Sequence, residues 1–334
     1  MALTATVPVV GALVFGATSI VWITRGPLAF NVQLALLFLT GALFHVFGFV
    51  LNEWADLEVD RASEDLQDKP LVSGQVSPGE AKWTAIAAAA MAFVPLAIVS
   101  LDPWAHLTLL AAILVGGAYD LWGKRMPLDL LLAGSITLLM LAGAMALGEF
   151  DIDYGLHVTL LACVGGLQFL QNLFQNAIEG GVKDADHDAA AGARTFAALL
   201  GVRIGPGGDL MSGPVFNGSA IVMKAVQIFL LIYTAVEVSY LPEDEMATVL
   251  GALLVLAIAV MVVTLGLMLP PARFDRGRLR RTFSIHELAT FGAIMLVLAP
   301  LIGPVVALGI FILPMAWFMA VNRLLFGGTL EPGV

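Results

Sequence analysis

Two short acidic segments follow long apolar runs in this sequence, and they share one spacing. In the first, NEWADLEVD, Asn52, Asp56 and Asp60 are four residues apart, and in the second, KDADHD, Asp184 and Asp188 are four apart. Residues four apart share one face of a helix, so each segment presents its carboxylates in a row. Mg²⁺ prefers hard oxygen ligands and accepts phosphate oxygens as co-ligands. Two such rows on one side of a membrane would therefore form a site for Mg²⁺ and a diphosphate.

Cationic and polar side chains accompany both rows. Arg61 and Lys69 follow the first row, Lys183 and Arg194 flank the second, and Tyr119 and Lys124 lie in the segment YDLWGKR at the end of another apolar run. Arg and Lys side chains pair with diphosphate oxygens, whereas Tyr, Trp and Lys at a membrane boundary also serve as interfacial anchors. Five amide side chains, at positions 168, 171, 172, 175 and 176, precede the second row. They either join helices by hydrogen bonds or line a cavity.

The composition indicates a polytopic α-helical membrane protein. The 334 residues have a mean hydropathy of +0.92 and are 59% hydrophobic, which is too apolar for a soluble domain of this size. The net charge of −10 argues against nucleic-acid binding, and the scarcity of lysine favours a high-salt cytoplasm such as that of halophilic archaea. The single cysteine, Cys163, lies in an apolar run and is expected only to pack.

Apolar runs of membrane-spanning length predict a bundle of nine or ten transmembrane helices around a central cavity. They cover residues 5–24, 31–51, 83–100, 104–121, 128–148, 157–178, 219–240, 246–269 and 287–322, the last being one helix or two divided at Gly303-Pro304. We interpret the first run as a spanning helix and not as a cleaved signal. The whole chain, 1–334, is expected to form a single domain.

The connecting segments differ in charge and so predict the membrane orientation. Lys and Arg concentrate in segments 52–82, 122–127, 179–218 and 270–286, and the alternate loops contain none, Arg25 being the exception. By the positive-inside rule, the basic loops are cytoplasmic, and so are the two acidic segments that they contain. The basic run from 273 to 281 suits anionic lipid headgroups, and the Gly/Pro-rich residues 203–218 predict a flexible loop. Each half of the chain repeats the order of helix, acidic row and basic loop, a weak pseudo-repeat.

From about Asn31 to Gly201, the order of motifs resembles the UbiA superfamily of intramembrane prenyltransferases, and an archaeal member in particular. The matching motifs are NxxxDxxxDR…KPLxSGxxS, then YxxxxK, then KDxxxD…GxRTxxxLLG. The resemblance implies nine helices around a cavity open to lipid, with two Mg²⁺ ions holding an isoprenyl diphosphate. It implies metal ligands at Asn52, Asp56, Asp60, Asp184 and Asp188, diphosphate partners at Arg61, Lys69, Lys124, Lys183 and Arg194, and a tyrosine beside the reacting carbon at Tyr119.

The expected activity is Mg²⁺-dependent transfer of an isoprenyl group, with geranylgeranyl diphosphate as the favoured donor. Neutralising the diphosphate charge lets an allylic diphosphate ionise, and an apolar chamber protects the allylic cation from water. The acceptor stays open between an archaeal ether-lipid precursor, a carotenoid and an aromatic or quinone precursor. Gly181 and Ala189 depart from residues common in the family, and these departures bear on which acceptor the chain uses.

Two more distant alternatives also place acidic residues in a membrane protein. A CDP-alcohol phosphotransferase needs one continuous acidic motif, which this chain lacks, and an ion-coupled transporter places its charges near the bilayer centre. The expected partners are the donor, a lipophilic acceptor and membrane lipids, with neither nucleic acid nor an obligate protein partner. The expected location is the cell membrane, with the active site on the cytoplasmic side.

Overall fold

The computed structural model describes residues 32–61, 66–67, 69–147, 155–238, 245–305, 307–312, 316 and 323. The predicted first span at 5–24 and the end of the predicted span 287–322 lie outside these residues. The chain divides into two compact units. Unit 1 comprises 1–121, 134–153 and 312–334, and unit 2 comprises 122–133 and 154–311.

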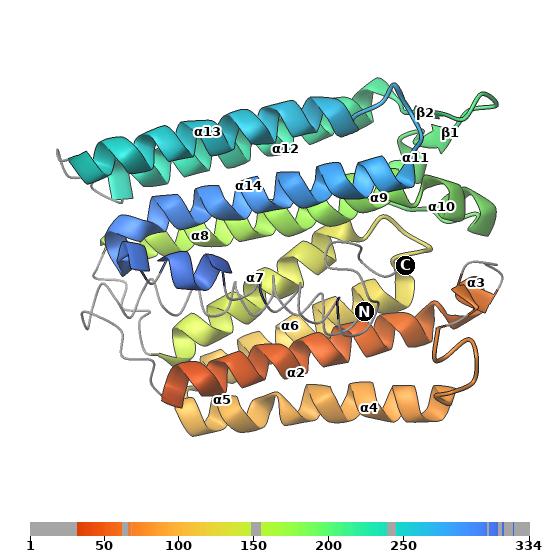
Figure 1. Ribbon diagram of the computed structural model, residues 1–334. Helices are drawn as coiled ribbons and strands as arrows, with labels where there is room; N and C mark the ends of the chain where they lie inside the picture. Colours follow the sequence, from red (N-terminus) through yellow and green to blue (C-terminus); the bar gives the residue numbers. More distant parts are fainter. Residues whose placement is uncertain are drawn as a thin grey trace. The chain divides into compact units, whose positions relative to one another are not determined.

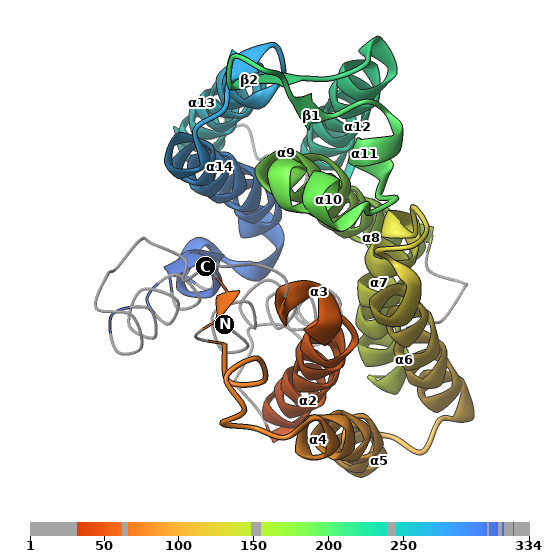
Figure 2. The same ribbon diagram turned by 90° about the vertical axis from the view of Figure 1, so that its right-hand side faces the viewer.

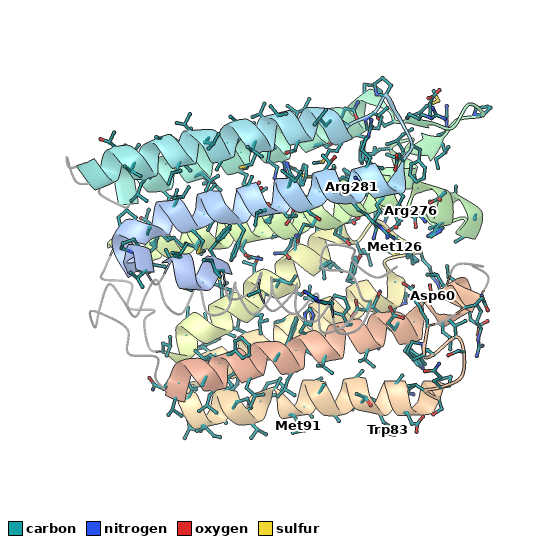
Figure 3. All side chains as sticks on the ribbon, viewed as in Figure 1. Asp60, Trp83, Met91, Met126, Arg276 and Arg281 are labelled. Carbon is teal, nitrogen blue, oxygen red and sulfur yellow. The ribbon has the colours of Figure 1, made fainter. Side chains whose placement is uncertain are left out.

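Unit 1 is built from helices that pack along α2 (Val32–Ala55). The short α3 (Leu57–Arg61) continues α2, and α4 (Pro78–Met91) and α5 (Phe93–Val99) run beside it (Figure 1). Helix α4 begins with a capping box, because the Ser77 hydroxyl accepts the Glu80 N–H at 3.2 Å while the Glu80 carboxylate accepts the Ser77 N–H at 2.8 Å. Trp83 and Met91 project from the outer face of α4 and are 68% and 55% exposed, as suits a lipid-facing helix (Figure 3).

Two further helices complete the described part of unit 1. They are α6 (Pro103–Trp122) and most of α7 (Asp129–Ala146). Glycines let α6 approach its neighbours closely, since a Cβ at Gly117 would lie 3.4 Å from the Phe47 ring of α2, and one at Gly116 would lie 3.3 Å from the Ser135 hydroxyl of α7. Small residues at such crossings are typical of helix packing in membranes.

In the larger segment of unit 2, the first helix is α8 (Gly155–Phe174), which continues through the π-helical turn η2 (Gln175–Gly180) into α9 (Gly181–Lys183). Helices α10 (Ala185–Ala191) and α11 (Phe196–Leu199) follow, then α12 (Pro214–Tyr233) with its π-helical end η3 (Thr234–Val238), α13 (Glu245–Met268) and α14 (Arg276–Ile302). Helix α12 packs on α8, and α13 packs on α14 (Figure 1). Gly166 of α8 faces Leu230 of α12, so close helix packing explains this small residue.

A three-stranded antiparallel sheet lies at one end of unit 2, near α11 (Figure 2). Its strands are β1 (Arg203–Ile204), β2 (Asp209–Met211) and β3 (Ala272–Arg273), with Ile204 opposite Leu210 and Leu210 opposite Ala272. The prediction of a flexible loop over 203–218 is therefore wrong. The glycines instead form the tight turn between β1 and β2, where Gly208 has a φ of +80° and donates its N–H to the Gly205 carbonyl.

The structure also tests three other features of the predicted helix pattern. Helix α14 begins at Arg276 rather than at 287, because Asp275 caps it by accepting the Arg278 N–H at 2.9 Å. It ends at Ile302, and the next residue, Gly303, has a φ of +87°, which confirms the predicted break at Gly303-Pro304. The segments 52–82 and 179–218, expected as loops, contain the short helices α3, α9, α10 and α11.

The described residues include seven helices long and apolar enough to cross a membrane, which confirms the polytopic α-helical class. They comprise 35–55, 78–99, 103–122, 129–146, 214–236, 248–268 and 276–302. Each overlaps a predicted run, and the helices at 78–99, 214–236 and 276–302 begin before the predicted starts at 83, 219 and 287. The count of nine or ten stays a prediction, because the first expected span lies outside the described residues.

Candidate functional site

The first acidic row forms a continuous helical turn at the junction of α2 and α3 in unit 1. The Asp56 N–H donates to the Asn52 carbonyl at 2.9 Å, and the Asp60 N–H donates to the Asp56 carbonyl at 2.9 Å. The three side chains therefore share a helix face, as their spacing predicts. Asp60 is buried, whereas Asn52 and Asp56 keep part of their surface exposed.

Lys69 holds the first row from the loop that follows it. Its ammonium lies 2.7 Å from Asp60 Oδ2 and 3.1 Å from Glu53 Oε1. Burial lowers the pKa of Lys69, but hydrogen bonds and charges from Asp60 and Glu53 outweigh it, so the pKa rises above its ordinary value of 10.5. Lys69 is thus charged at neutral pH and offsets two carboxylates. Arg61 instead pairs with the exposed Glu58 at 3.1 Å.

The end of α6 contributes a carboxylate to unit 1 that the sequence reasoning missed. Asp120 is only 9% exposed and lies near enough to Asp56 for the two carboxylates to repel each other. Its Oδ2 is 3.9 Å from the position that a Cβ on Gly48 would occupy, which places it against α2. Tyr119, the residue singled out beside it, is half-buried. An acid within an apolar run was the available signal for Asp120.

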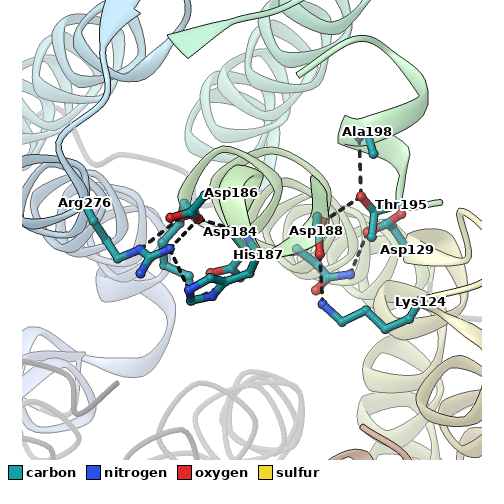
Figure 4. Close-up of polar contacts among 11 residues, drawn as sticks. Lys124, Asp129, Asp184, Asp186, His187, Asp188, Thr195, Ala198 and Arg276 are labelled. Carbon is teal, nitrogen blue, oxygen red and sulfur yellow. Dashed lines mark hydrogen bonds and ion pairs between the residues drawn. The ribbon is translucent and has the colours of Figure 1, made fainter. Parts of the chain in front are cut away.

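The second acidic row lies in unit 2, where α10 follows α9. Asp188 is 5% exposed and both its oxygens have partners (Figure 4). Lys124 lies 3.1 Å from Oδ1, and the Thr195 hydroxyl donates to Oδ2 at 2.9 Å. The Arg194 N–H donates to the Lys124 carbonyl at 3.0 Å, which fixes the backbone that carries this lysine. The structure thus brings three predicted site residues together: Lys124, Asp188 and Arg194.

The other acids of this segment have different surroundings. Asp184 is one helical turn from Asp188, since the Asp188 N–H donates to the Asp184 carbonyl at 2.8 Å, and it forms an ion pair with Lys183 at 3.5 Å. Asp186, between them, points to Arg276 at the start of α14 (Figure 4). Arg276 also donates to the Lys183 carbonyl at 3.4 Å. Arg276, which belongs to the basic run predicted to contact lipid headgroups, therefore binds the segment that carries the second row.

A cavity of about 290 Å³ opens beside Asp188. Small residues of α9, α10 and α11 line it, among them Gly181, Ala185 and Ala198. Gly181 is required by packing on the neighbouring helix, because a Cβ there would lie only 2.2 Å from the Ala197 Cβ. The departure from the family pattern at Gly181 therefore accompanies a close approach of α9 and α11 in this chain.

The donor atoms of both rows fit Mg²⁺. Within the part of the chain that the structure describes, no three acidic, histidine or cysteine side chains gather into a complete metal site. Mg²⁺ is commonly bound through one or two carboxylates together with substrate phosphates and water, so a pair of aspartates in a row matches its usual coordination. A carboxylate also has lone pairs for a metal beyond those that accept from lysine or threonine. Mg²⁺ held there would bring a positive charge against a phosphate group.

Membrane-spanning helices that carry carboxylate rows and lysines at their ends define an integral membrane protein suited to an anionic phosphorylated ligand. The profile of the UbiA prenyltransferase family matches residues 8–265. The chain therefore belongs to the UbiA prenyltransferase family.

Individual relatives agree with this family. The chain is 28% identical over 143 residues to a protoheme IX farnesyltransferase of Cereibacter sphaeroides, covering 41% of this chain and 45% of the relative. It is 32% identical over 168 residues to a digeranylgeranylglyceryl phosphate synthase of Methanoculleus marisnigri, covering 48% of this chain and 55% of the relative. The match thus spans about half the length of these curated relatives.

Solved structures share the fold. A UbiA homologue from Aeropyrum pernix K1 superimposes with a TM-score of 0.65 at 21% identity, covering 90% of this chain and 98% of the homologue. A UbiA homologue from Archaeoglobus fulgidus, solved with GPP and Mg²⁺, gives a TM-score of 0.57 at 21% identity, covering 89% and 98%. At this identity, the likeness establishes the intramembrane fold.

Proposed function

We propose that this chain transfers an isoprenyl group, preferably geranylgeranyl, from its diphosphate to a lipophilic acceptor in the cell membrane. The observation that carries the proposal is that each row has a buried aspartate paired with a lysine. Asp60 pairs with Lys69 at 2.7 Å, and Asp188 pairs with Lys124 at 3.1 Å. Each row thus combines carboxylates for a divalent metal with a cation for phosphate oxygens.

The proposed ligands of Mg²⁺ are Asn52, Asp56 and Asp60 in unit 1 and Asp184 and Asp188 in unit 2, with two ions expected. When bound, Mg²⁺ neutralises the diphosphate and makes it a better leaving group. Lys69, Lys124, Lys183, Arg61 and Arg194 supply further positive charge to its oxygens. Apolar helices hold the prenyl tail and exclude water from the allylic cation. Tyr119 is proposed to face the reacting carbon.

We infer that the acceptor is an archaeal glyceryl ether-lipid precursor, because a relative at 32% identity is named a digeranylgeranylglyceryl phosphate synthase. The relatives named protoheme IX farnesyltransferase supply a second candidate pair, farnesyl diphosphate and protoheme. Carotenoid and aromatic acceptors are the remaining candidates and are included in the test. The active site is proposed to face the cytoplasm, as the loop charges predict.

The test combines purified protein in lipid with Mg²⁺, labelled geranylgeranyl or farnesyl diphosphate, and each of these acceptors, and products are identified by mass spectrometry. We expect a geranylgeranylated glyceryl phosphate as the main product. Formation of a farnesylated protoheme alone would move the assignment to the second candidate. No prenylated product with any pair would overturn the proposed function.

A matched pair of variants tests the second row. Asp188→Asn removes the negative charge between Lys124 and Thr195 and is expected to abolish transfer. Asp186→Asn lies two residues away and removes only the negative charge that faces Arg276, because the asparagine Oδ1 still accepts from Arg276 and from the His187 N–H. The Asp186 side chain is 38% exposed and Arg276 keeps its bond to the Lys183 carbonyl, so transfer is expected to persist. Equal activity of the two folded variants would contradict the role of Asp188.

A further inference from the structure

The cavity at the second acidic row has a buried floor and an exposed rim, both within unit 2. Its floor includes Gly181 and Ala185, which are buried. Its rim is formed by Ala189, Gly192 and Ala193, which all keep exposed surface. A cavity with this distribution of burial opens at the surface of the unit and is accessible to a ligand.

The cavity wall carries a single charged side chain. Of the eight residues that line it, Asp188 alone has a polar side chain, and the others are glycine, alanine and valine. Its carboxylate accepts from Lys124 at 3.1 Å and from the Thr195 hydroxyl at 2.9 Å (Figure 4). These bonds use two of its roughly four lone-pair sites, so it can still accept a hydrogen bond from a ligand. The interior therefore suits an uncharged group with hydroxyl donors and disfavours a phosphate.

The volume of the cavity limits the size of that group. The cavity measures about 290 Å³. An apolar protein cavity of about 150 Å³ admits benzene, so this one holds a group on the order of ten non-hydrogen atoms. A glyceryl phosphate has about this size. A porphyrin ring system and a geranylgeranyl chain are both too large to enter.

Two cations lie beside the cavity, where a phosphate at the rim could contact them. The Lys124 side chain is 41% exposed although its ammonium pairs with Asp188. Arg194 is exposed and directly follows the rim residue Ala193, and its N–H donates to the Lys124 carbonyl at 3.0 Å. A neutral interior beside cations matches the two parts of a glyceryl phosphate, a hydroxyl-bearing chain and an anionic end.

Both positions at which the sequence departs from the family pattern line this cavity. They are Gly181 on the floor and Ala189 on the rim. A longer side chain at Ala189 would extend over the opening, and Gly181 has no room for even a Cβ, which would lie 2.2 Å from the Ala197 Cβ. The open space beside Asp188 therefore depends on small residues that are particular to this chain.

We propose that this cavity binds the glyceryl part of the acceptor, with the acceptor's phosphate at the rim beside Lys124 and Arg194. A hydroxyl of the glyceryl chain donates to Asp188, and Ala189 and Ala193 set the size of the head group that enters. The inference rests on the proposed function, in which the acceptor is a glyceryl ether-lipid precursor. It adds the place where the head group is held and the residues that select it.

Neighbouring alanines of α10 provide a matched pair of variants. Ala189 and Ala190 are both exposed, but only Ala189 lines the cavity. Ala189→Leu is expected to raise the KM for the glyceryl acceptor by about tenfold or more, as for a change of a few methylenes in a pocket. The kcat at saturating acceptor and the Mg²⁺-dependent binding of a non-reactive donor analogue should stay unchanged. Ala190→Leu should leave all three quantities unchanged.

A second variant narrows the same opening from the other side. Ala193→Leu extends from the loop after α10 and is expected to raise the same KM, so the test does not depend on one substitution. Circular dichroism establishes that each variant is folded before its kinetics are compared. An unchanged acceptor KM in folded Ala189→Leu or Ala193→Leu overturns the inference.

Saturation-transfer NMR tests the cavity without turnover, with glycerol phosphate as the probe and the protein in lipid nanodiscs. Transfer to the glycerol protons is expected for wild type and Ala190→Leu and is expected to disappear for Ala189→Leu. Propyl phosphate, which lacks the hydroxyls, should give a weaker signal because it cannot donate to Asp188. Equal signals from the two probes, or an unchanged signal in Ala189→Leu, would overturn the assignment of the glyceryl part to this cavity.

The outcomes separate this inference from the proposed function. Prenylation of a glyceryl acceptor with an unchanged KM in the rim variants overturns the cavity assignment and leaves the proposed function intact. A glycerol phosphate signal that is lost in Ala189→Leu, in a protein that prenylates no acceptor, supports the binding site and overturns the proposed function.

Discussion

Replacing Lys69 with methionine removes the cation that holds the first acidic row. Methionine keeps much of the aliphatic volume of lysine, so the main loss is the charge and its hydrogen bonds. Asp60 and Glu53 would then lie beside each other with no cation, and Asp60 is only 7% exposed. The variant is therefore expected to lose stability and, with it, the geometry of the first row.

The size of the loss follows from the exposure of the pair. Removing one partner of a fully buried pair costs about 3–5 kcal/mol, and an exposed pair is worth about 0–1 kcal/mol. The side chains of Lys69 and Asp60 retain 20% and 10% exposure, so water screens part of their attraction. We therefore expect Lys69→Met to lower the free energy of unfolding by about 2 kcal/mol, between these limits.

The stability difference between wild type and Lys69→Met should also depend on pH. Because the pKa of Lys69 is raised in the folded protein, its contribution is fully present below the unfolded value of 10.5 and is lost as pH rises through the folded value. The difference between wild type and Lys69→Met should thus be constant near neutral pH and shrink above about pH 10.5.

The assay is reversible denaturant titration of both proteins in lipid bicelles, followed by circular dichroism at neutral and alkaline pH. Arg61→Met is the matched control, because its pair with Glu58 is 48% and 85% exposed and is worth at most about 1 kcal/mol. Equal losses in the two variants, or a Lys69→Met loss that persists at high pH, would refute the reasoning.

Three further predictions concern the metal, the packing and the topology. Transfer is expected to stop in excess EDTA and to return with Mg²⁺ or Mn²⁺, so full activity without a divalent cation would rule out the metal rows. Gly181→Ala should destabilise the fold by about 1–3 kcal/mol, because the new Cβ would lie 2.2 Å from the Ala197 Cβ. Gly218→Ala, with open space around the new Cβ, should leave the stability unchanged, and thermal unfolding of the two variants measures the difference. In a background lacking Cys163, Ala190→Cys should react with a thiol reagent added on the cytoplasmic side, and Leu101→Cys, at an 84% exposed position, should react with the reagent added on the opposite side. Labelling of both cysteines from one side would contradict the predicted orientation.

The acidic rows were predictable because helical periodicity is local. Asn52, Asp56 and Asp60 share a face through backbone bonds four residues long, and a sequence displays that spacing directly. The partners of the rows depend on tertiary structure. Lys69 is nine residues from Asp60, and Lys124 is 64 residues from Asp188, so spacing alone did not show which aspartate each lysine contacts.

A buried network of polar side chains in unit 2 shows a different limit. Lys224 was visible as a charge inside the apolar run 219–240, and a charge there is a functional signal by default. Lys224 is linked to Glu287 through the side chains of Gln227 and Gln171. Glu287 was placed at the edge of a span, because the predicted start of that helix was set by hydropathy and ignored the cap at Asp275. With α14 beginning at Arg276, Glu287 lies three turns inside the helix and opposite Lys224 and Gln171.

The misplaced start of α14 has a physical origin. Hydropathy ends a predicted helix where charges begin, yet a capped helix extends through charged residues whenever they find partners on neighbouring helices. Leu279, Phe283 and His286 are buried on the added turns of α14, so those turns pack against the bundle although their exposed face carries arginines. A charged residue near a predicted boundary is therefore better assigned by its cap and its buried helical neighbours than by the hydropathy of the window. Applied to the sequence alone, that rule places Glu287 within a helix and makes a pairing with Lys224 a reasonable expectation.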